Sequence, residues 1–341
     1  MKKVFVKFQS TFMSILVLFL TISLCSITMG STTLASEHGK VSAKQGKVAI
    51  VLASFGTTEP SAIGSITNIQ DKIKKAFPGI PVKITFTSNI IRSVWKERQA
   101  DSKKWLGKGI PKEILYVKNI IATVGNLRED GYRNIIVQPT HMFFMEQAQD
   151  LSSYVNALAS IKTTKEKWMP FDKIVMGRPA LGCPGDKYDY HDDMEKALNT
   201  LADDVKLAKE KNAKLVYMGH GNEHWSTGIY MEAAKKMGEL YPKVVTYIGS
   251  VEGFPGIEDV ARYLSHHNSG NIVLKPFMIV AGDHAINDMA SDEEDSWKSI
   301  LTKQGFKVTT VLKGLGSNDK FAQIFVDHIK DAAHDNGIVL K

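Results

Sequence analysis

Cysteine is almost absent from this chain of 341 residues, which contains only Cys25 and Cys183. Removal of an N-terminal segment that includes Cys25 would leave one thiol, so no internal disulfide could form. Neither a cysteine-ligated zinc site nor an iron–sulfur cluster can be built from one cysteine. The chain is long enough for two domains, and 43% of its residues are hydrophobic. Its stability must therefore come from a packed core.

Several familiar binding motifs are also missing. No glycine-rich dinucleotide fingerprint follows a strand, no Walker loop is present, and no Gly-x-Ser-x-Gly elbow occurs. We therefore expect no nucleotide cofactor and no serine-hydrolase chemistry. The formal net charge of +7 is dispersed, without a basic stripe interleaved with aromatic residues. This excess is too weak to predict nucleic acid binding, although it would help to attract a small polyanion.

The N-terminus has the layout of a secretory signal peptide. Lys2, Lys3 and Lys7 precede an apolar stretch at 13–24, and Thr33-Leu34-Ala35 places small residues at the −3 and −1 positions of a cleavage site. We predict a leader at 1–35, a polar linker at 36–46, and a mature protein in the periplasm or outside the cell. An uncleaved membrane anchor is the alternative. Otherwise the sequence predicts no contact with a membrane.

Short apolar runs alternate with helical patterns along the rest of the chain. This rhythm is typical of parallel sheets covered by helices on both faces. The predicted strands are 47–54, 82–86, 134–138, 215–218, 244–248 and one that starts at 271 and ends near Val280, and the clearest predicted helices are 63–77, 111–129 and 319–333. The NIVLKP segment at 271–276 echoes NIIVQP at 134–139. We therefore predict two similar α/β lobes, 47–178 and 179–341, with a cleft between them and a last helix that could pack on either lobe.

Polar side chains follow the predicted strands at their carboxyl ends, where ligands bind in such sheets. His220 lies between two glycines after one strand, Glu252 follows the next, and His284 follows the third. Imidazole and carboxylate together suit a divalent ion such as cobalt, iron or zinc. Each residue alone could be an ordinary hydrogen-bonded loop residue, but three on successive strand ends predict one metal site. His141 ends the matching strand of the first lobe and could face the same cleft.

The segment AGDHAINDMASD at 281–292, followed by DSWK at 295–298, resembles the signature of the CbiK-type sirohydrochlorin cobaltochelatases. Shorter segments match the same family in the same order: SFGT at 54–57, FTS at 86–88, MGHG at 218–221, VE at 251–252 and GLG at 314–316. The resemblance covers roughly residues 47–330. It implies the class II chelatase fold, two lobes around a cleft, and ATP-independent insertion of Co²⁺ into a sirohydrochlorin-type tetrapyrrole, as in anaerobic cobalamin biosynthesis.

The resemblance also implies roles for individual residues. His220, Glu252 and His284 are expected to be the catalytic and metal-binding trio. The expected substrate-binding residues are Ser54, Phe55, His141 and Glu146. Cobalt would be the metal substrate, with Fe²⁺ or Zn²⁺ as alternatives. Arg92, Lys96 and Arg98 could form a basic rim for the substrate carboxylates, but an exposed helix would explain them equally well.

Two features depart from the family pattern. Where the family has an acid and a tyrosine, this chain has Gln147 and Ala148, although Glu146 could replace the acid. Cobalamin synthesis is cytoplasmic, whereas the leader predicts export. A second hypothesis is therefore an exported carrier of a tetrapyrrole, haem or metal, with little turnover. The sequence does not decide between a monomer and a homo-oligomer.

Overall fold

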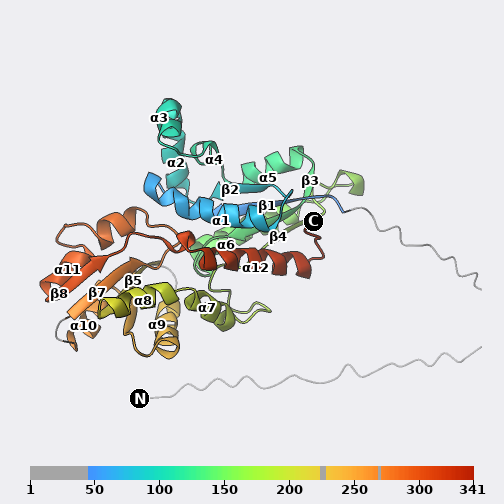
Figure 1. Cartoon of the computed structure of the whole chain (residues 1–341). Coiled ribbons are helices and arrows are strands. Elements are labelled where there is room, and N and C mark those ends of the chain that lie inside the picture. Colours follow the sequence, from blue (N-terminus) through green and yellow to red (C-terminus); the bar gives the residue numbers. More distant parts are fainter. Residues whose placement is uncertain (1–44, 223–227, 268–269) are drawn as a thin grey trace, which may run out of the picture. The chain divides into compact units, whose positions relative to one another are not determined.

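Two separate parallel sheets, each of four strands, form the framework of the part of the chain that the structure describes (Figure 1). The structure is a computed structural model that describes residues 45–222, 228–267 and 270–341. The predicted leader and residues 36–44 of the predicted linker lie outside these ranges. The described residues form one compact unit. The predicted α/β class with two similar sheet-based lobes is confirmed.

The first sheet has the strand order β2-β1-β3-β4. Its strands are β1 (Lys47–Ser54), β2 (Val82–Phe86), β3 (Tyr132–Pro139) and β4 (Lys173–Met176). The connections contain η1 (Pro60–Ala62), α1 (Ile63–Ala76), α2 (Asn89–Arg98), η2 (Gln99–Asp101), α3 (Ser102–Gly107), α4 (Lys112–Leu115), α5 (Ile120–Glu129), α6 (Glu146–Ala159) and η3 (Glu166–Trp168).

The second sheet repeats this topology with the order β6-β5-β7-β8. Its strands are β5 (Ala213–Gly221), β6 (Thr246–Glu252), β7 (Gly270–Pro276) and β8 (Phe306–Thr310). The accompanying helices are α7 (Tyr190–Asn199), α8 (Ala202–Glu210), α9 (Gly228–Leu240), α10 (Ile257–Ser265), a π-helical turn η4 (Ala285–Met289), α11 (Trp297–Lys303), η5 (Leu315–Ser317) and α12 (Asp319–Asp335).

The central strand β1 shows why these segments fold as they do. Successive side chains of a strand point to opposite faces of the sheet. Ile50 and Leu52 enter a core shared with α1 and α12, whereas Ala49 and Val51 pack against α5 and α6. Both faces are thus buried, which explains why the strand is an uninterrupted apolar run.

The last helix, α12, belongs to the second lobe by sequence but contacts α1 and β3 of the first. Its apolar residues Phe321, Phe325 and Ile329 are fully buried in the same core as Ile66 of α1 and Tyr217 of β5. One of the hydrophobic clusters among the described residues therefore extends through both lobes and fixes the two sheets relative to each other.

The predicted helix at 111–129 is wrong as a continuous element. It is interrupted between α4 and α5, where Lys118 pairs with Thr85 beside the edge strand β2. Asn119 then begins α5, and its side chain accepts a hydrogen bond from the backbone of Ala122. The short edge strands β4 and β8 were not predicted, because runs of four or five residues carry little periodic signal.

Candidate functional site

A cavity of about 720 Å³ is lined by residues of both lobes. Its walls come from the loop after β1, the beginning of α2, residues 140–148 after β3, the segment 220–222, Glu252, and residues 277–284 after β7. These segments follow the carboxyl ends of parallel strands, which is where open α/β sheets bind ligands. The volume lies within the range of small-molecule and cofactor sites. All seven predicted site residues line this cavity.

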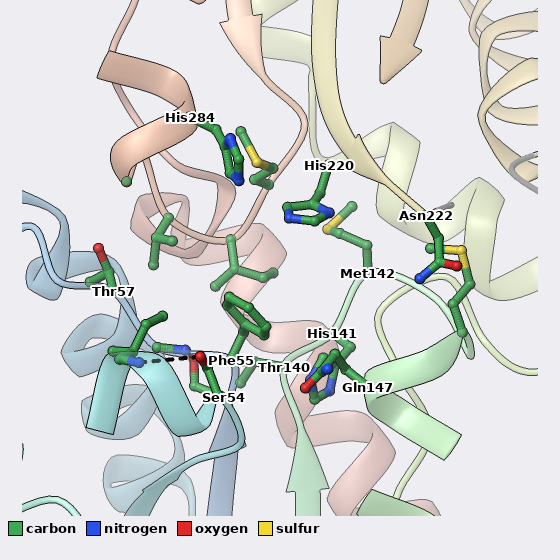
Figure 2. A pocket seen from close by; sticks show the side chains of 18 of the residues that line it. Ser54, Phe55, Thr57, Thr140, His141, Met142, Gln147, His220, Asn222 and His284 are labelled. Carbon is green, nitrogen blue, oxygen red and sulfur yellow. Dashed lines mark hydrogen bonds between the residues drawn. The ribbon is translucent and has the colours of Figure 1, made fainter. Parts of the chain in front are cut away.

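His220 and His284 lie side by side in it (Figure 2). Their ring centroids are 4.9 Å apart and the ring planes are nearly perpendicular. Nδ1 of His220 is 3.1 Å from the carbonyl oxygen of Gly221, and Nδ1 of His284 is 2.5 Å from Oδ2 of Asp288. Both acceptors are oxygens without a proton to donate, so each Nδ1 must be the donor. The lone pair of each ring is therefore on Nε2.

Glu252 is the third member of the predicted trio, and one of its carboxylate oxygens is 3.8 Å from Nδ1 of His220. More than a third of each of these two side chains is exposed, so both can turn. In the described part of the chain, no three His, Cys, Asp or Glu side chains are arranged so that they could already hold a metal ion. Simultaneous ligation by His220, Glu252 and His284 therefore requires rotation of side chains that the cavity leaves room to move.

Two glycines position His220. Gly221 has a φ of +80°, and a Cβ there would lie 1.7 Å from the carbonyl oxygen of Glu252. A Cβ on Gly219 would lie 2.8 Å from the ring of Tyr230. The hydroxyl of buried Tyr230 accepts a hydrogen bond from the Gly221 amide, and burial raises its pKa to about 12. Only glycines allow β5 to approach its neighbours this closely while leaving the imidazole uncovered.

His141 occupies the part of the cavity formed by the first lobe (Figure 2). Its Nε2 is 3.4 Å from the hydroxyl oxygen of Thr87, and its buried Nδ1 has no hydrogen-bond partner among the described residues. Burial lowers the pKa of His141 to about 4. The ring is therefore neutral at pH 7 and does not repel a cation in the cavity.

The other predicted substrate residues lie on the same walls. Ser54 and Phe55 form part of the loop after β1, and the Phe55 ring is 6.2 Å from the ring of His220. Glu146, at the beginning of α6, accepts a hydrogen bond of 2.9 Å from Asn222 of the second lobe. Glu146 is thus partly occupied by a contact between the lobes. This partner could not be predicted, because the two residues are far apart along the chain.

The predicted basic rim is not found among the described residues, since no lysine or arginine lines the cavity. The guanidinium of Arg92 donates to the carbonyl oxygens of Phe86 and Thr87. That of Arg98 donates to the carbonyl of Thr58 and packs on the ring of Trp95. Both arginines support the backbone behind the cavity wall instead of facing the substrate space.

Comparison with known proteins assigns the chain to a family. The family described as cobalt chelatase (CbiK) matches residues 48–334. The chain belongs to the cobalt chelatase (CbiK) family.

The chain is also similar to two curated proteins over most of its length. It is 26% identical over 286 residues to "Sirohydrochlorin cobaltochelatase CbiKC" of Nitratidesulfovibrio vulgaris, covering 84% of this chain and 90% of the relative. It is 27% identical over 288 residues to "Sirohydrochlorin cobaltochelatase" of Salmonella typhimurium, covering 84% and 96%. Among solved structures, it resembles "SirB from Bacillus subtilis with Fe3+", with a TM-score of 0.55, 12% identity, and coverage of 86% of this chain and all of that one. The structural likeness supports the fold alone.

Proposed function

We propose that this protein is a sirohydrochlorin cobaltochelatase, which inserts Co²⁺ into a sirohydrochlorin-type tetrapyrrole without a nucleotide. The observation that carries the proposal is the meeting of His220, His284 and Glu252 in one cavity lined by both lobes. Two imidazoles and one carboxylate form a donor set that suits Co²⁺, Fe²⁺ or Zn²⁺. Membership of the cobalt chelatase family and the names of the curated relatives support cobalt and sirohydrochlorin as the substrates.

The chemistry requires two exchanges. The ion leaves its water and protein ligands for four ring nitrogens, and the two pyrrole N–H protons leave the ring as the metal–nitrogen bonds form. His220 and His284 present Nε2 lone pairs to the incoming metal. Glu252, half-exposed beside His220, can bind the ion or accept a released proton. Because His141 is neutral, the first lobe adds no positive charge that would oppose the cation.

The walls suit the body of a flat macrocycle. Phe55, Met142, Met145 and Ile279 give the cavity a largely apolar lining, and Ile90 at its edge is 78% exposed. Since no lysine or arginine lines the cavity within the described residues, the substrate carboxylates would have to point outward to water or to backbone and hydroxyl donors. Burying an unpaired carboxylate would cost several kcal/mol.

A direct assay tests the proposal. Purified protein is mixed with sirohydrochlorin and Co²⁺ at pH 7–8, and the absorption spectrum is followed over time, with Fe²⁺ and Zn²⁺ in parallel. We expect catalysed conversion to the cobalt complex and its loss in His220→Ala and His284→Ala. Tight binding of the tetrapyrrole with conversion no faster than in buffer would instead identify a carrier. Wild-type rates in both variants would refute the proposed site.

We also propose that the protein is exported and that residues 1–35 are removed. The basic start, the apolar stretch at 13–24 and the small residues at 33–35 support this proposal. None of the helices in the described ranges combines the length and apolar composition needed to cross a membrane. N-terminal sequencing of protein from the native host should begin near Ser36. A mature cytoplasmic chain that retains Met1 would contradict the proposal.

A further inference from the structure

Asp288 contacts His284 on the side of the ring away from its free lone pair. Nδ1 of His284 is 2.5 Å from Oδ2 of Asp288, four residues later in the chain. An ionised carboxylate can only accept a hydrogen bond, so the proton of the neutral imidazole must be on Nδ1. This contact selects the tautomer in which Nε2 is free to bind a metal.

The local backbone holds Asp288 in place. It lies in the π-helical turn η4, where Ala285 and Met289 are fully buried. Both pack in the core of the second lobe together with Trp297. π-Helical turns are rare and are frequently found at functional sites. The carboxylate is therefore carried by a turn that is anchored on both sides.

The neighbouring acid does not compete for the imidazole. Asp283 accepts a hydrogen bond of 2.8 Å from the side chain of Asn287. This pair has the same four-residue spacing as His284 and Asp288 but contains no histidine. The two pairs lie alongside each other, and each acid has its own donor. Asp288 is thus the carboxylate assigned to His284.

We propose that Asp288 is a positioning residue that fixes the tautomer and orientation of His284 for metal binding, an inference that rests on the proposed role of His284 as a ligand. Carboxylates that accept a hydrogen bond from a metal-binding histidine orient its ring and increase its basicity. Loss of such a partner typically lowers metal affinity or activity about 10- to 100-fold. Asp288 does not touch the ion. It acts only through the imidazole.

The test measures Co²⁺ binding to the full chain without tetrapyrrole, from the visible absorption of the bound ion. The variants are Asp288→Ala, Asp288→Asn, His284→Ala and the double alanine variant. The matched control is Asp292→Ala. Asp292 is an exposed acid of the same segment, its partner is Lys298, and it does not line the cavity. Thermal unfolding of each variant establishes that it is folded.

We expect Asp288→Ala to weaken Co²⁺ binding about 10- to 100-fold and to raise the KM for Co²⁺ but not that for sirohydrochlorin. Asp288→Asn keeps an acceptor oxygen and should lose less Co²⁺ affinity than Asp288→Ala. The double variant should bind Co²⁺ no worse than His284→Ala, because Asp288 would have no other route of action.

Two results would overturn the inference while leaving the proposed function intact. One is an additive loss in the double variant. The other is an Asp288→Ala protein that binds Co²⁺ like the Asp292→Ala control, although His284→Ala loses binding. Wild-type Co²⁺ affinity in His284→Ala would instead remove both the proposed ligand role and the inference.

Discussion

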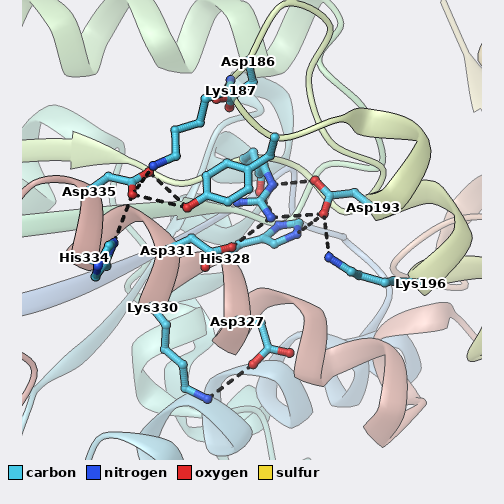
Figure 3. A network of polar contacts seen from close by, with 12 residues as sticks. Asp186, Lys187, Asp193, Lys196, Asp327, His328, Lys330, Asp331, His334 and Asp335 are labelled. Atoms are coloured by element: carbon cyan, nitrogen blue, oxygen red, sulfur yellow. Dashed lines mark hydrogen bonds and ion pairs between the residues drawn. The ribbon is translucent and has the colours of Figure 1, made fainter.

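A buried ion-pair network joins the two lobes, and its removal should destabilise the protein strongly (Figure 3). Arg178, just after β4, donates to both carboxylate oxygens of Asp193 on α7, at 2.5 and 3.0 Å. It also contacts Asp331 of α12 at 2.9 Å. His328 of α12 donates from Nδ1 to the carbonyl of Arg178, and its Nε2 is 3.5 Å from Asp193. The network therefore ties together three segments from different parts of the chain.

The exposure of each side chain sets the expected order of effects. Arg178 and Asp193 are only 5% and 1% exposed, whereas Asp331 is 34% exposed. Breaking a buried pair by removing one partner typically costs about 3–5 kcal/mol, because an uncompensated charge remains. We expect Arg178→Ala to lower the unfolding free energy by about this amount. Asp193→Asn should lower it less, since Asp331 still faces the arginine. Asp331→Asn should lower it by about 1 kcal/mol or less.

Lowering the pH should reduce the difference in unfolding free energy between the wild-type protein and Asp193→Asn. Burial acts to raise the pKa of Asp193, but its contacts with His328 and Arg178 outweigh burial and hold the pKa well below its ordinary value. A carboxyl group with a lowered folded-state pKa stabilises the protein fully above its unfolded pKa of about 3.9, and this contribution falls as pH drops toward the folded value. The gap between the two proteins should thus be largest near pH 7 and smaller at pH 3.

Urea unfolding at both pH values, followed by circular dichroism, measures these free energies. The exposed pair of Lys330 and Asp327, also on α12, supplies the control variant Asp327→Asn, which should change stability little. Equal losses in Asp193→Asn and Asp331→Asn would refute the argument from burial. A gap that widens toward pH 3 would refute the assigned direction of the pKa shift.

Three further predictions concern the cavity. Glu252→Gln should lower turnover about 10²-fold or more at pH 7–8 if the carboxylate binds metal or accepts a proton. Turnover close to that of the wild type would show that Glu252 has only a structural role. Gly221→Ala should abolish activity and lower the melting temperature, because its Cβ would overlap the Glu252 carbonyl. The control is Gly79→Ala. Gly79 has a φ of +87° but open space around it, so this variant measures the cost of backbone strain alone. Burial lowers the pKa of His141 to about 4, so the folded state resists protonation of this ring. The unfolding free energy should therefore fall as pH drops from about 6.5 toward 4. Urea unfolding of His141→Gln should show a smaller decline over the same pH range.

Much of this fold follows from patterns that are local in the sequence. The buried strand β1 and the helix α1 were predicted almost to their boundaries, since one is a continuous apolar run and the other places isoleucines on one face. The break between α4 and α5 could not be predicted, because it depends on a pairing with β2 some thirty residues earlier in the chain.

For the site, too, local sequence patterns predict some residues, and contacts between distant parts of the chain determine the others. His220, Glu252 and His284 could be predicted because each lies at or after the carboxyl end of a strand, and parallel strands bring these ends to one edge of the sheet. Asp288 could have been found from its four-residue spacing to His284. The contact between Glu146 and Asn222 could not, because it depends on how the two lobes pack. Arg92 and Arg98 carry the positive charge expected of a basic rim around the cavity. Their positions could not be predicted, because they depend on the carbonyl groups that the guanidinium groups bind.

The repeated topology explains how one site acquires two different walls. β1 and β5 are equivalent central strands, and a ring-bearing residue and a glycine with positive φ stand where each strand ends. Phe55 and Gly56 come directly after β1, and His220 and Gly221 are the last two residues of β5. Each glycine lies close to the neighbouring strand, where a Cβ would meet the Phe86 ring or the Glu252 carbonyl. The two lobes thus build the same turn at the same place, and the rings of Phe55 and His220 come within 6.2 Å of each other. Under the proposed function, the apolar ring of the first lobe would contact the macrocycle and the imidazole of the second lobe would bind the metal.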